Sequence, residues 1–178
     1  MIYDPFQKEA IEYTRAGHNV FVCAPTGAGK TLIAEEVIKM SLQRGEGVIY
    51  TAPIKALSNQ KFRDFSEQFG EEKVGIITGD VSINASSPIV IMTTEIFRNY
   101  IIQSPHKLEE KTWVIFDEIH YLDDIERGTV WEESLILMPQ HINFLALSAT
   151  LPNVYEIVSW LRSVLNRPVK LVLSLIHI

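Results

Sequence analysis

A glycine-containing turn near the N-terminus has the residue types and spacing of a phosphate-binding loop. Residues 24–31 read Ala-Pro-Thr-Gly-Ala-Gly-Lys-Thr and lie between an apolar run and a stretch with helical periodicity. Glycines let the backbone curl so that successive N–H groups and the following helix N-terminus face a phosphate chain. The residues expected to surround that chain are Pro25, Thr26, Gly27, Ala28, Gly29, Lys30 and Thr31. The turn therefore predicts a nucleotide-binding site.

Two side chains at the end of this turn have separate expected roles. Lys30 would reach the β and γ phosphates, and Thr31 would place its hydroxyl on Mg²⁺. The general phosphate-loop pattern begins with glycine, whereas Ala24 stands at that place here. A glycine-rich turn that binds nothing is the structural alternative, and the strand and helix predicted on either side of the turn argue against it.

A pair of acidic residues supplies the other half of this chemistry. Asp117 and Glu118 directly follow the apolar run at 113–116. Asp117, at the tip of that strand, would hold Mg²⁺ through the hydration shell of the ion, and Glu118 would face the water that attacks the γ-phosphate. An acidic pair at a strand end is otherwise a solvated turn or a helix cap, but its combination with a phosphate loop favours the functional interpretation.

The elements that must position these residues alternate along the chain as short apolar runs and amphipathic stretches. This alternation predicts an α/β fold in which helices cover a mainly parallel sheet, with ligands bound at the carboxyl ends of the strands. Strands are expected at 19–24, 47–52, 74–78, 89–93, 113–117 and 144–148. Helices are expected at 29–43, 55–69, 94–102, 130–137 and 153–164.

Composition restricts the class of protein. The chain has 178 residues, 47% of them hydrophobic, which is enough apolar sequence for one domain with a buried core. Its formal net charge of −6 argues against binding nucleic acid by bulk charge, so any such site must be local. The single cysteine, Cys23, excludes an intramolecular disulfide. Without a secretory leader or a bilayer-spanning apolar run, we expect an intracellular protein, cytoplasmic or nuclear, with no membrane partner.

The acidic pair belongs to a longer pattern that resembles a known family. The sequence is Asp-Glu-Ile-His at 117–120, and Ser-Ala-Thr follows the next predicted strand at 148–150. This combination is similar to the DExH-box helicases of superfamily 2. The resemblance implies a RecA-like phosphate-loop domain of three α/β/α layers, with ATP and Mg²⁺ as ligands. It also implies that His120 belongs to the catalytic acidic segment, and that the hydroxyls of Ser148 and Thr150 hydrogen-bond towards this segment and couple the state of the γ-phosphate to the contact with a nucleic-acid strand.

The same resemblance gives a role to a glutamine upstream of the phosphate loop. Phe6-Gln7 lies where such helicases carry a glutamine that reads adenine, and a side-chain amide can satisfy the N6 donor and N7 acceptor of the base together. Structural alternatives stay open for these assignments. Gln7 could be an exposed polar residue at a helix start. Ser148 and Thr150 could be an ordinary strand exit and helix cap.

Three segments that each follow a predicted strand resemble the nucleic-acid-contacting motifs of the family. They lie at 51–61, 78–80 and 93–99. Hydroxyls, backbone N–H groups and cations at such places can hold a sugar-phosphate backbone without reading bases. The residues assigned to this surface by resemblance are Thr51, Pro53, Lys55, Gly79, Asp80, Thr94 and Arg98. Without the resemblance, the threonines would be interpreted as helix N-caps.

The surroundings of the acidic pair are most similar to one branch of the family, the Ski-two-like helicases. The similar runs are 116–122, 126–128 and 131–133, and the resemblance as a whole extends from about Phe6 to about Val172. It implies the first RecA-like domain of an ATP-dependent helicase that moves 3′–5′ along single-stranded nucleic acid, RNA rather than DNA. Turnover in such enzymes needs arginine fingers from a second RecA-like domain that this chain lacks, so we expect nucleotide binding with poor hydrolysis.

Other functions stay open on the sequence alone. One is a DNA helicase of the same branch, and another is a non-catalytic nucleic-acid-binding scaffold. Intact Lys30, Asp117 and Glu118 argue against the scaffold. A phosphate-loop ATPase of a transporter or of a protein-remodelling machine would not be expected to carry the segments at 93–95 and 148–150.

The last residues depart from the family pattern. Residues 167–172 resemble the approach to the interdomain linker of these helicases, whereas Leu-Ser-Leu-Ile-His-Ile at 173–178 does not continue it. We therefore expect 1–172 to be the native domain and 173–178 to be the non-native tail of a truncated reading frame.

Overall fold

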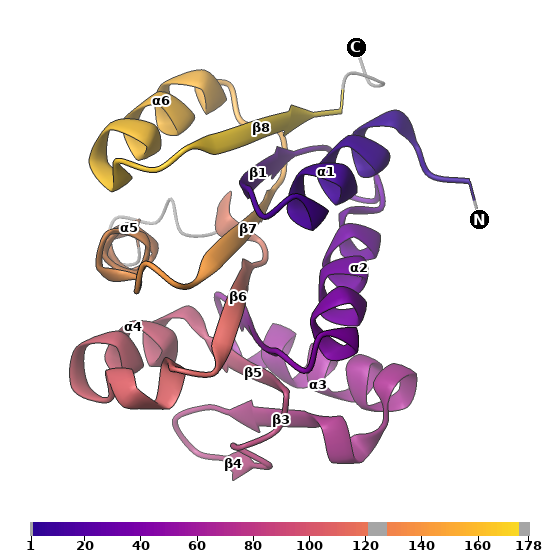
Figure 1. Cartoon of the computed structure of the whole chain (residues 1–178), viewed down its shortest axis with the longest axis vertical. Coiled ribbons are helices and arrows are strands. Elements are labelled where there is room, and N and C mark those ends of the chain that lie inside the picture. Colours follow the sequence, from indigo (N-terminus) through magenta and orange to yellow (C-terminus); the bar gives the residue numbers. More distant parts are fainter. Residues whose placement is uncertain (1, 121–127, 175–178) are drawn as a thin grey trace.

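The computed structural model describes residues 2–120 and 128–174, and in these residues eight strands form one sheet (Figure 1). The strands are β1 (Asn19–Cys23), β2 (Gly47–Ala52), β3 (Val74–Ile77), β4 (Ser82–Ile83), β5 (Ile89–Thr93), β6 (Lys111–Phe116), β7 (Asn143–Ser148) and β8 (Val169–Leu173). Their order across the sheet is β4-β3-β5-β2-β6-β7-β1-β8. Neighbouring strands pair in parallel except for β3 with the short edge strand β4.

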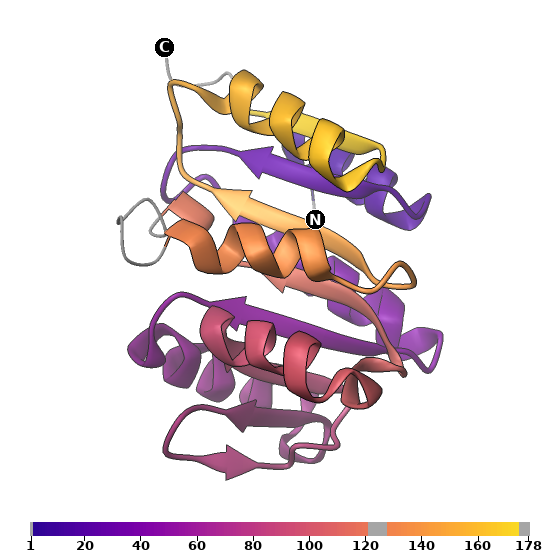
Figure 2. The ribbon, with the colours of Figure 1, turned by 90° about the vertical axis from the view of Figure 1, so that its left-hand side faces the viewer.

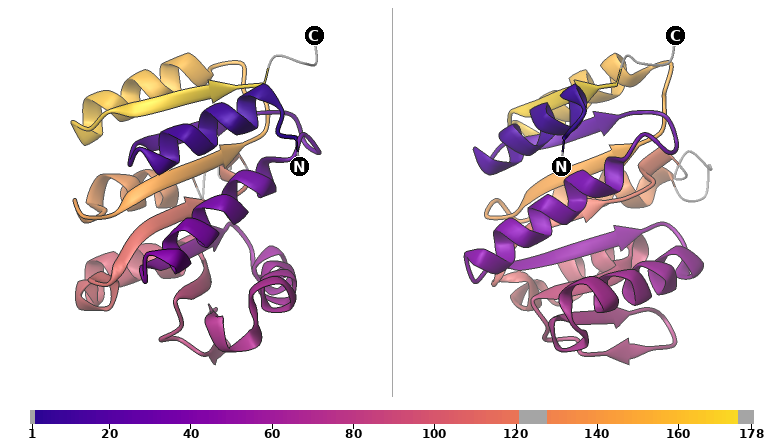
Figure 3. Two further views of the ribbon diagram at one scale, coloured as in Figure 1. Left: turned by 45° about the vertical axis from the view of Figure 1, so that its right-hand side comes forward. Right: turned by 90° about the vertical axis from the view of Figure 1, so that its right-hand side faces the viewer.

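Helices cover both faces of this sheet. Figure 2 views the face covered by α4 (Thr94–Gln103), α5 (Gly128–Leu137) and α6 (Val154–Leu165). The right panel of Figure 3 views the opposite face, which is covered by α1 (Pro5–Arg15), α2 (Lys30–Gln43) and α3 (Lys55–Phe69). Two short 3₁₀ helices, η1 (Glu71–Lys73) and η2 (Pro105–Leu108), precede β3 and β6. The expected three-layer α/β/α architecture is confirmed.

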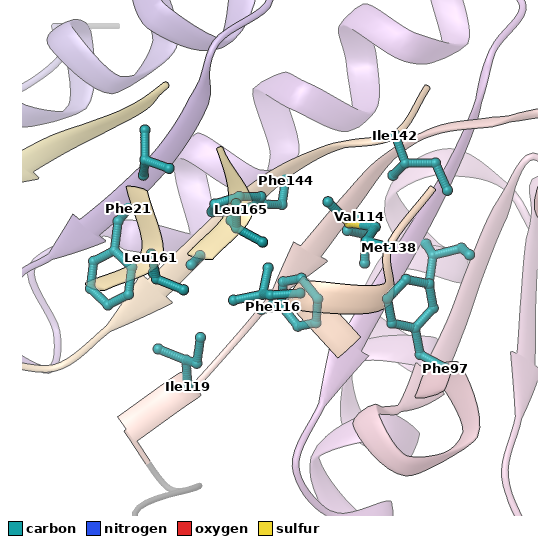
Figure 4. Close-up of a cluster of buried hydrophobic side chains, with 14 of the residues drawn as sticks. Phe21, Phe97, Val114, Phe116, Ile119, Met138, Ile142, Phe144, Leu161 and Leu165 are labelled. Carbon is teal, nitrogen blue, oxygen red and sulfur yellow. The ribbon is translucent and has the colours of Figure 1, made fainter. Parts of the chain in front are cut away.

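The core has two apolar layers, one on each face of the sheet. Along β1, Val20 and Val22 pack towards the α1–α3 layer, while Phe21 packs towards the α4–α6 layer. Figure 4 shows the second layer, where Phe116 of β6 meets Phe97 of α4 with ring centroids 5.7 Å apart. Strands buried on both faces must be apolar at nearly every position, which explains the continuous apolar runs of the sequence.

Most elements lie within three residues of their predicted bounds, but the two 3₁₀ helices, one α-helix and two strands were not predicted. Helix α1 precedes the phosphate loop, β4 pairs antiparallel with β3, and β8 pairs with β1. Strand β8 reaches Leu173, and the Ser174 N–H donates to the Cys23 carbonyl at 3.1 Å. Residues 175–178 of the expected tail and 121–127 of the Ski-two-like pattern lie outside the described residues. Within the described part, no helix has the length and apolarity needed to cross a membrane.

Parallel pairing gathers the carboxyl ends of the strands at one edge, which we call the carboxyl edge of the sheet. The order of strands divides this edge into two halves. Strands β6, β7 and β1 carry the acidic pair, the Ser-Ala-Thr segment and the phosphate loop, and strands β3, β5 and β2 carry the three segments assigned to nucleic acid. The strand order therefore brings together residues that are far apart in the sequence.

Candidate functional site

The turn between β1 and α2 has the curled backbone that a phosphate loop requires. Gly27 and Gly29 have φ angles of 82° and 93°, a left-handed conformation that residues with a Cβ rarely adopt. At Gly29 a Cβ would also lie 2.5 Å from Nε2 of Gln7, so a side chain there would displace the Gln7 amide from the loop. The turn closes through a hydrogen bond from the Ala28 N–H to the Pro25 carbonyl at 3.1 Å. Both glycines are therefore required by the geometry of the turn.

The Lys30 ammonium lies inside this turn. Its Nζ donates to the carbonyls of Ala24 at 2.7 Å and Pro25 at 3.1 Å. Burial lowers the pKa of Lys30 below its ordinary value, and the nearby carboxylates of Glu118 and Asp117 act in the opposite direction. The ammonium is thus held between the loop backbone and the acidic pair, which is where a β or γ phosphate would meet it.

Gln7 is a buried residue of α1 that contacts the phosphate loop. Its Oε1 accepts a hydrogen bond from the Asp4 N–H at 2.8 Å, and its Nε2 donates to the Gly29 carbonyl at 3.0 Å. Only 6% of the residue is exposed, which excludes the alternative of a solvated polar residue at a helix start. The amide therefore joins the N-terminus of α1 to the last glycine of the loop.

The carboxylate of Asp117 is fixed from two sides at the end of β6. Its Oδ1 accepts from the Glu118 N–H at 2.9 Å, and its Oδ2 accepts from the hydroxyl of Tyr50. The backbone is also held, because the Asp117 N–H donates to the Thr51 carbonyl at 3.0 Å. Glu118 has a φ of 54°, an uncommon conformation for a glutamate and one that clusters at functional sites. A simple solvated turn would need none of these constraints.

His120 lies between Glu118 and the segment that follows β7, and it contacts both. The His120 Nδ1 accepts from the Ala149 N–H at 3.0 Å, and its Nε2 lies 2.9 Å from Oε2 of Glu118. Because Nδ1 accepts a hydrogen bond, a proton on the neutral ring would sit on Nε2, the nitrogen that faces the Glu118 carboxylate. His120 is therefore oriented by the backbone of one strand end and in turn orients the acid of another.

The Ser-Ala-Thr segment makes this connection differently from the expectation. The buried Ser148 hydroxyl donates to the Ala149 carbonyl at 2.8 Å, and the Thr150 side chain is exposed. The hydrogen bond to the acidic segment comes from the backbone amide of Ala149. The same segment reaches the base of the phosphate loop, because the Ala24 N–H donates to the Ser148 carbonyl at 3.0 Å and the Cys23 thiol donates to the Ala149 carbonyl at 3.2 Å.

The residues at this half of the edge suit Mg²⁺ bound together with a triphosphate. Mg²⁺ prefers hard oxygen ligands and is usually held by one or two carboxylates, waters and substrate phosphates. Asp117 offers a fixed carboxylate, and Thr31 offers a half-buried hydroxyl in the first turn of α2. The segment at 148–149 contacts both His120 of the acidic segment and Ala24 of the loop, which brings the carboxylates to the side of the loop that would hold the phosphates.

The other half of the carboxyl edge contains a groove of about 390 Å³ beside the ends of β2 and β5. It is lined by four residues assigned to nucleic acid from the sequence, namely Pro53, Lys55, Gly79 and Thr94. The Lys55 ammonium lies 2.5 Å from a carboxylate oxygen of Asp80, and both side chains are exposed. A cation is thus available at the groove, but it is partly neutralised by its neighbour.

Three of the assigned residues have protein partners for the polar groups of their side chains, and one of them, Thr94, also lines the groove. The hydroxyl of the fully buried Thr51 donates to the Ile115 carbonyl at 3.1 Å, and that of Thr94 donates to the Ala52 carbonyl at 3.4 Å. Nη1 of Arg98 lies 3.7 Å from Oε2 of Glu133 on α5. Any contact from the two threonines would therefore come from their backbone.

Tyr50 belongs to the site but was not found from the sequence. It is the fourth residue of β2, it is completely buried, and its hydroxyl contacts Asp117. A signal was present, since a phenolic hydroxyl in a strand buried on both faces must find a polar partner. The sequence did not identify that partner, because Asp117 is 67 positions away.

Comparisons with known proteins agree with this arrangement. The family model for DEAD/DEAH box helicases matches residues 4–157. The chain is 51% identical over 158 residues to the antiviral helicase SKI2 of Saccharomyces cerevisiae, covering 89% of this chain and 12% of SKI2. It is 46% identical over 167 residues to the human exosome RNA helicase MTR4, covering 94% of this chain and 16% of MTR4. The chain thus spans less than a fifth of the length of these relatives.

A solved structure shows the same fold. The DUF1998 helicase MrfA bound to DNA superposes with a TM-score of 0.80 and 22% identity, covering 97% of this chain and 27% of MrfA. At this identity the likeness concerns the fold, whereas the family match and the sequence relatives concern ancestry. The chain therefore belongs to the DEAD/DEAH box helicase family, its fold is that of a RecA-like helicase domain, and about half of its residues are identical to those of SKI2 and MTR4 over the aligned region.

Proposed function

We propose that this domain binds Mg·ATP between the phosphate loop and the acidic pair, and that it is the first RecA-like domain of an ATP-dependent RNA helicase. One observation carries this proposal. Hydrogen bonds from the Ala149 N–H to His120 and from the Ala24 N–H to the Ser148 carbonyl join the ends of β6, β7 and β1, and His120 also contacts Glu118, so the acidic pair and the phosphate loop lie at one edge. Such an edge is where open α/β sheets bind nucleotides.

Each residue at this edge has a distinct proposed role in hydrolysis. Lys30 would exchange its contacts with the loop carbonyls for phosphate oxygens. Thr31 and Asp117 would hold Mg²⁺, which neutralises negative charge on the phosphates. Glu118, oriented by His120, would position the attacking water. Arginine fingers of a second RecA-like domain contribute roughly 10³ to 10⁵ in rate in such enzymes, so this domain alone would hydrolyse ATP slowly.

RNA is the proposed strand, and the protein is proposed to act inside the cell. Support comes from the printed names of the relatives, which include the exosome RNA helicase MTR4 and the ATP-dependent RNA helicase DExH9 of Arabidopsis thaliana, 48% identical over 169 residues. DNA is the second candidate, because the structural neighbour MrfA is bound to DNA. The groove beside Lys55 would contact the sugar-phosphate backbone of either strand.

The test is the ATPase rate of the two-domain protein that we propose to contain this domain. The rate is measured with single-stranded RNA, with single-stranded DNA and with neither. We expect RNA to stimulate hydrolysis more than DNA. Equal or greater stimulation by DNA would favour a DNA helicase, and a rate that neither strand changes would contradict a helicase function.

The Glu118→Gln variant separates chemistry from binding in the same protein. Glutamine keeps the length and shape of the side chain beside His120, but it lacks the charge that positions water, so we expect turnover to be lost and ATP affinity to stay within about twofold. Glu67→Gln is the matched control, because Glu67 is exposed on α3. Hydrolysis that survives in the Glu118→Gln variant would show that another group positions the water.

A further inference from the structure

Tyr50 is a polar residue in the middle of an apolar layer. It points from β2 into the core beneath α1–α3, where its ring meets Phe65 edge-on with centroids 5.1 Å apart. The Lys61 ammonium lies 6.0 Å from the centroid of the same ring. These neighbours fix the position of the ring, so the hydroxyl has one direction in which to point, and it points at Oδ2 of Asp117.

The hydroxyl can serve only as a donor to this carboxylate. An ionised carboxylate offers only acceptor oxygens, so in this contact the Tyr50 hydroxyl must be the donor. A buried hydroxyl without a partner is costly, and a charge-assisted hydrogen bond to a carboxylate is among the stronger ones. The contact is therefore a constraint on Asp117 as well as on Tyr50.

The constraint acts on a carboxylate that is already held on its other oxygen. Oδ1 accepts from the Glu118 N–H within the turn, and Oδ2 accepts from the neighbouring strand. With both oxygens fixed, the plane of the carboxylate cannot rotate, and its remaining lone pairs keep one direction. Outer-shell hydrogen bonds of this kind orient metal-binding groups in general.

We propose that Tyr50 is a positioning residue for Asp117, holding this carboxylate in the orientation that binds the Mg²⁺ of Mg·ATP. The proposal rests on the proposed nucleotide site. Strand β2 would then serve both sites, because it supplies Tyr50 to the nucleotide site and leads into the groove that begins at Pro53.

The first test measures how much Mg²⁺ the chain needs to bind ADP. Fluorescent ADP is titrated into wild type and Tyr50→Phe at a series of Mg²⁺ concentrations. We expect similar ADP affinity at saturating Mg²⁺, but about tenfold more Mg²⁺ at the midpoint for the variant. Tyr13→Phe is the matched control, because Tyr13 lies on α1 beside His18 and should leave the midpoint unchanged.

The outcomes separate this proposal from the nucleotide site itself. Wild type that binds no ADP would overturn the proposed function. Binding by wild type with the same Mg²⁺ midpoint in Tyr50→Phe would overturn only the role of Tyr50. A variant that is merely less stable would lose ADP affinity with and without Mg²⁺ alike, and that result would also count against a positioning role.

The second test needs neither metal nor nucleotide. Thermal unfolding is compared for wild type, Tyr50→Phe, Asp117→Ala and the double variant. Asp117→Ala leaves the Tyr50 hydroxyl buried without its acceptor, so we expect it to lower Tm more in wild type than in the Tyr50→Phe background. Equal shifts in the two backgrounds would show that the two side chains are not coupled, and the proposal would fall.

Discussion

The Gln7 amide contacts both the start of α1 and the phosphate loop, and it has two possible roles in nucleotide binding. Its amide is engaged by Asp4 and Gly29, yet each amide group can form a further hydrogen bond. The resemblance assigns it to adenine, and the geometry assigns it to support of the loop. These two contributions differ in their dependence on the base.

Gln7→Met tests them, since methionine keeps the length of the side chain and removes its hydrogen bonds. We expect weaker binding of ADP, with a smaller loss for GDP, if the amide also reads adenine. Isothermal titration with both nucleotides measures the two losses, and the exposed Lys8→Met serves as the control on the same helix. Equal losses for ADP and GDP would restrict Gln7 to holding the loop.

The reactivity of the buried Cys23 thiol shows how readily the end of β1 opens to solvent. The thiol is 4% exposed under the phosphate loop, and burial raises its pKa above the ordinary value. Less thiolate is therefore present at any given pH, and access is blocked as well. We expect a thiol reagent at pH 8 to modify the native chain far more slowly than the chain in denaturant. Equally fast modification of both would mean that this part of the sheet opens readily.

The role of a residue could be predicted from the sequence where a short motif defines it, but not where it depends on a partner far away in the chain. Lys30, Asp117 and Glu118 follow from short motifs, and the structure gives each a position that suits the expected role. The contact of Ala149 with the acidic segment is made by a backbone amide, which any residue could provide. Its side chain therefore carries no sequence signal.

At the level of elements, the start of α3 and the turn after β3 meet in the ion pair of Lys55 with Asp80. Both residues were assigned to the nucleic-acid surface, but a carboxylate and a phosphate compete for the same ammonium. An exposed pair of this kind is worth only about 0.2–1 kcal/mol, so a strand can displace it. The two residues are expected to have opposite effects on strand binding.

Salt dependence tests this expectation directly. Lys55→Ala should weaken binding of single-stranded RNA, whereas Asp80→Asn should strengthen it by a few fold. The slope of log K against log salt should become steeper in Asp80→Asn by about 0.7, because one more phosphate is neutralised by a free cation. Weaker binding by Asp80→Asn would show that the carboxylate itself contacts the strand.

Elements with strong periodicity could be predicted from the sequence, and the elements that were missed are short or lie at the edges of the sheet. Strand β4 has only two residues, too few to show a period. Strand β8 lies at the other edge, and its residues were interpreted as the approach to a linker. Helix α1 did carry signals, because Asp4 and Pro5 are typical of a helix start and Phe6, Ala10 and Ile11 share its buried face. That helix could have been predicted.

For the whole molecule, the decisive feature is the order of strands, which the sequence does not contain. Strand β2 lies beside β6 although α3, β3, β5 and α4 separate them along the chain. This placement brings Tyr50 to Asp117 and puts the groove next to the acidic pair. The pair β2 and β6 is therefore the direct structural link between the proposed nucleotide site and the proposed strand-binding groove.

The division of the carboxyl edge also explains why a second domain would be needed. One half offers a lysine, a hydroxyl and two acids to a triphosphate, but these leave the outer side of the phosphates to be covered by another protein surface. We expect the 178-residue chain to hold nucleotide and to show ATP hydrolysis well below that of the two-domain protein. Comparable rates per site would contradict a role for a second domain in turnover.

The most direct test of the nucleotide site is calorimetric titration of the folded chain with Mg·ADP, alongside Lys30→Ala and the exposed control Lys39→Ala. We expect one molecule of ADP to bind wild type and Lys39→Ala alike, and binding to be lost or strongly weakened in Lys30→Ala. Absence of binding by the folded wild-type chain, or unchanged affinity in Lys30→Ala, would contradict a triphosphate site between the phosphate loop and the acidic pair.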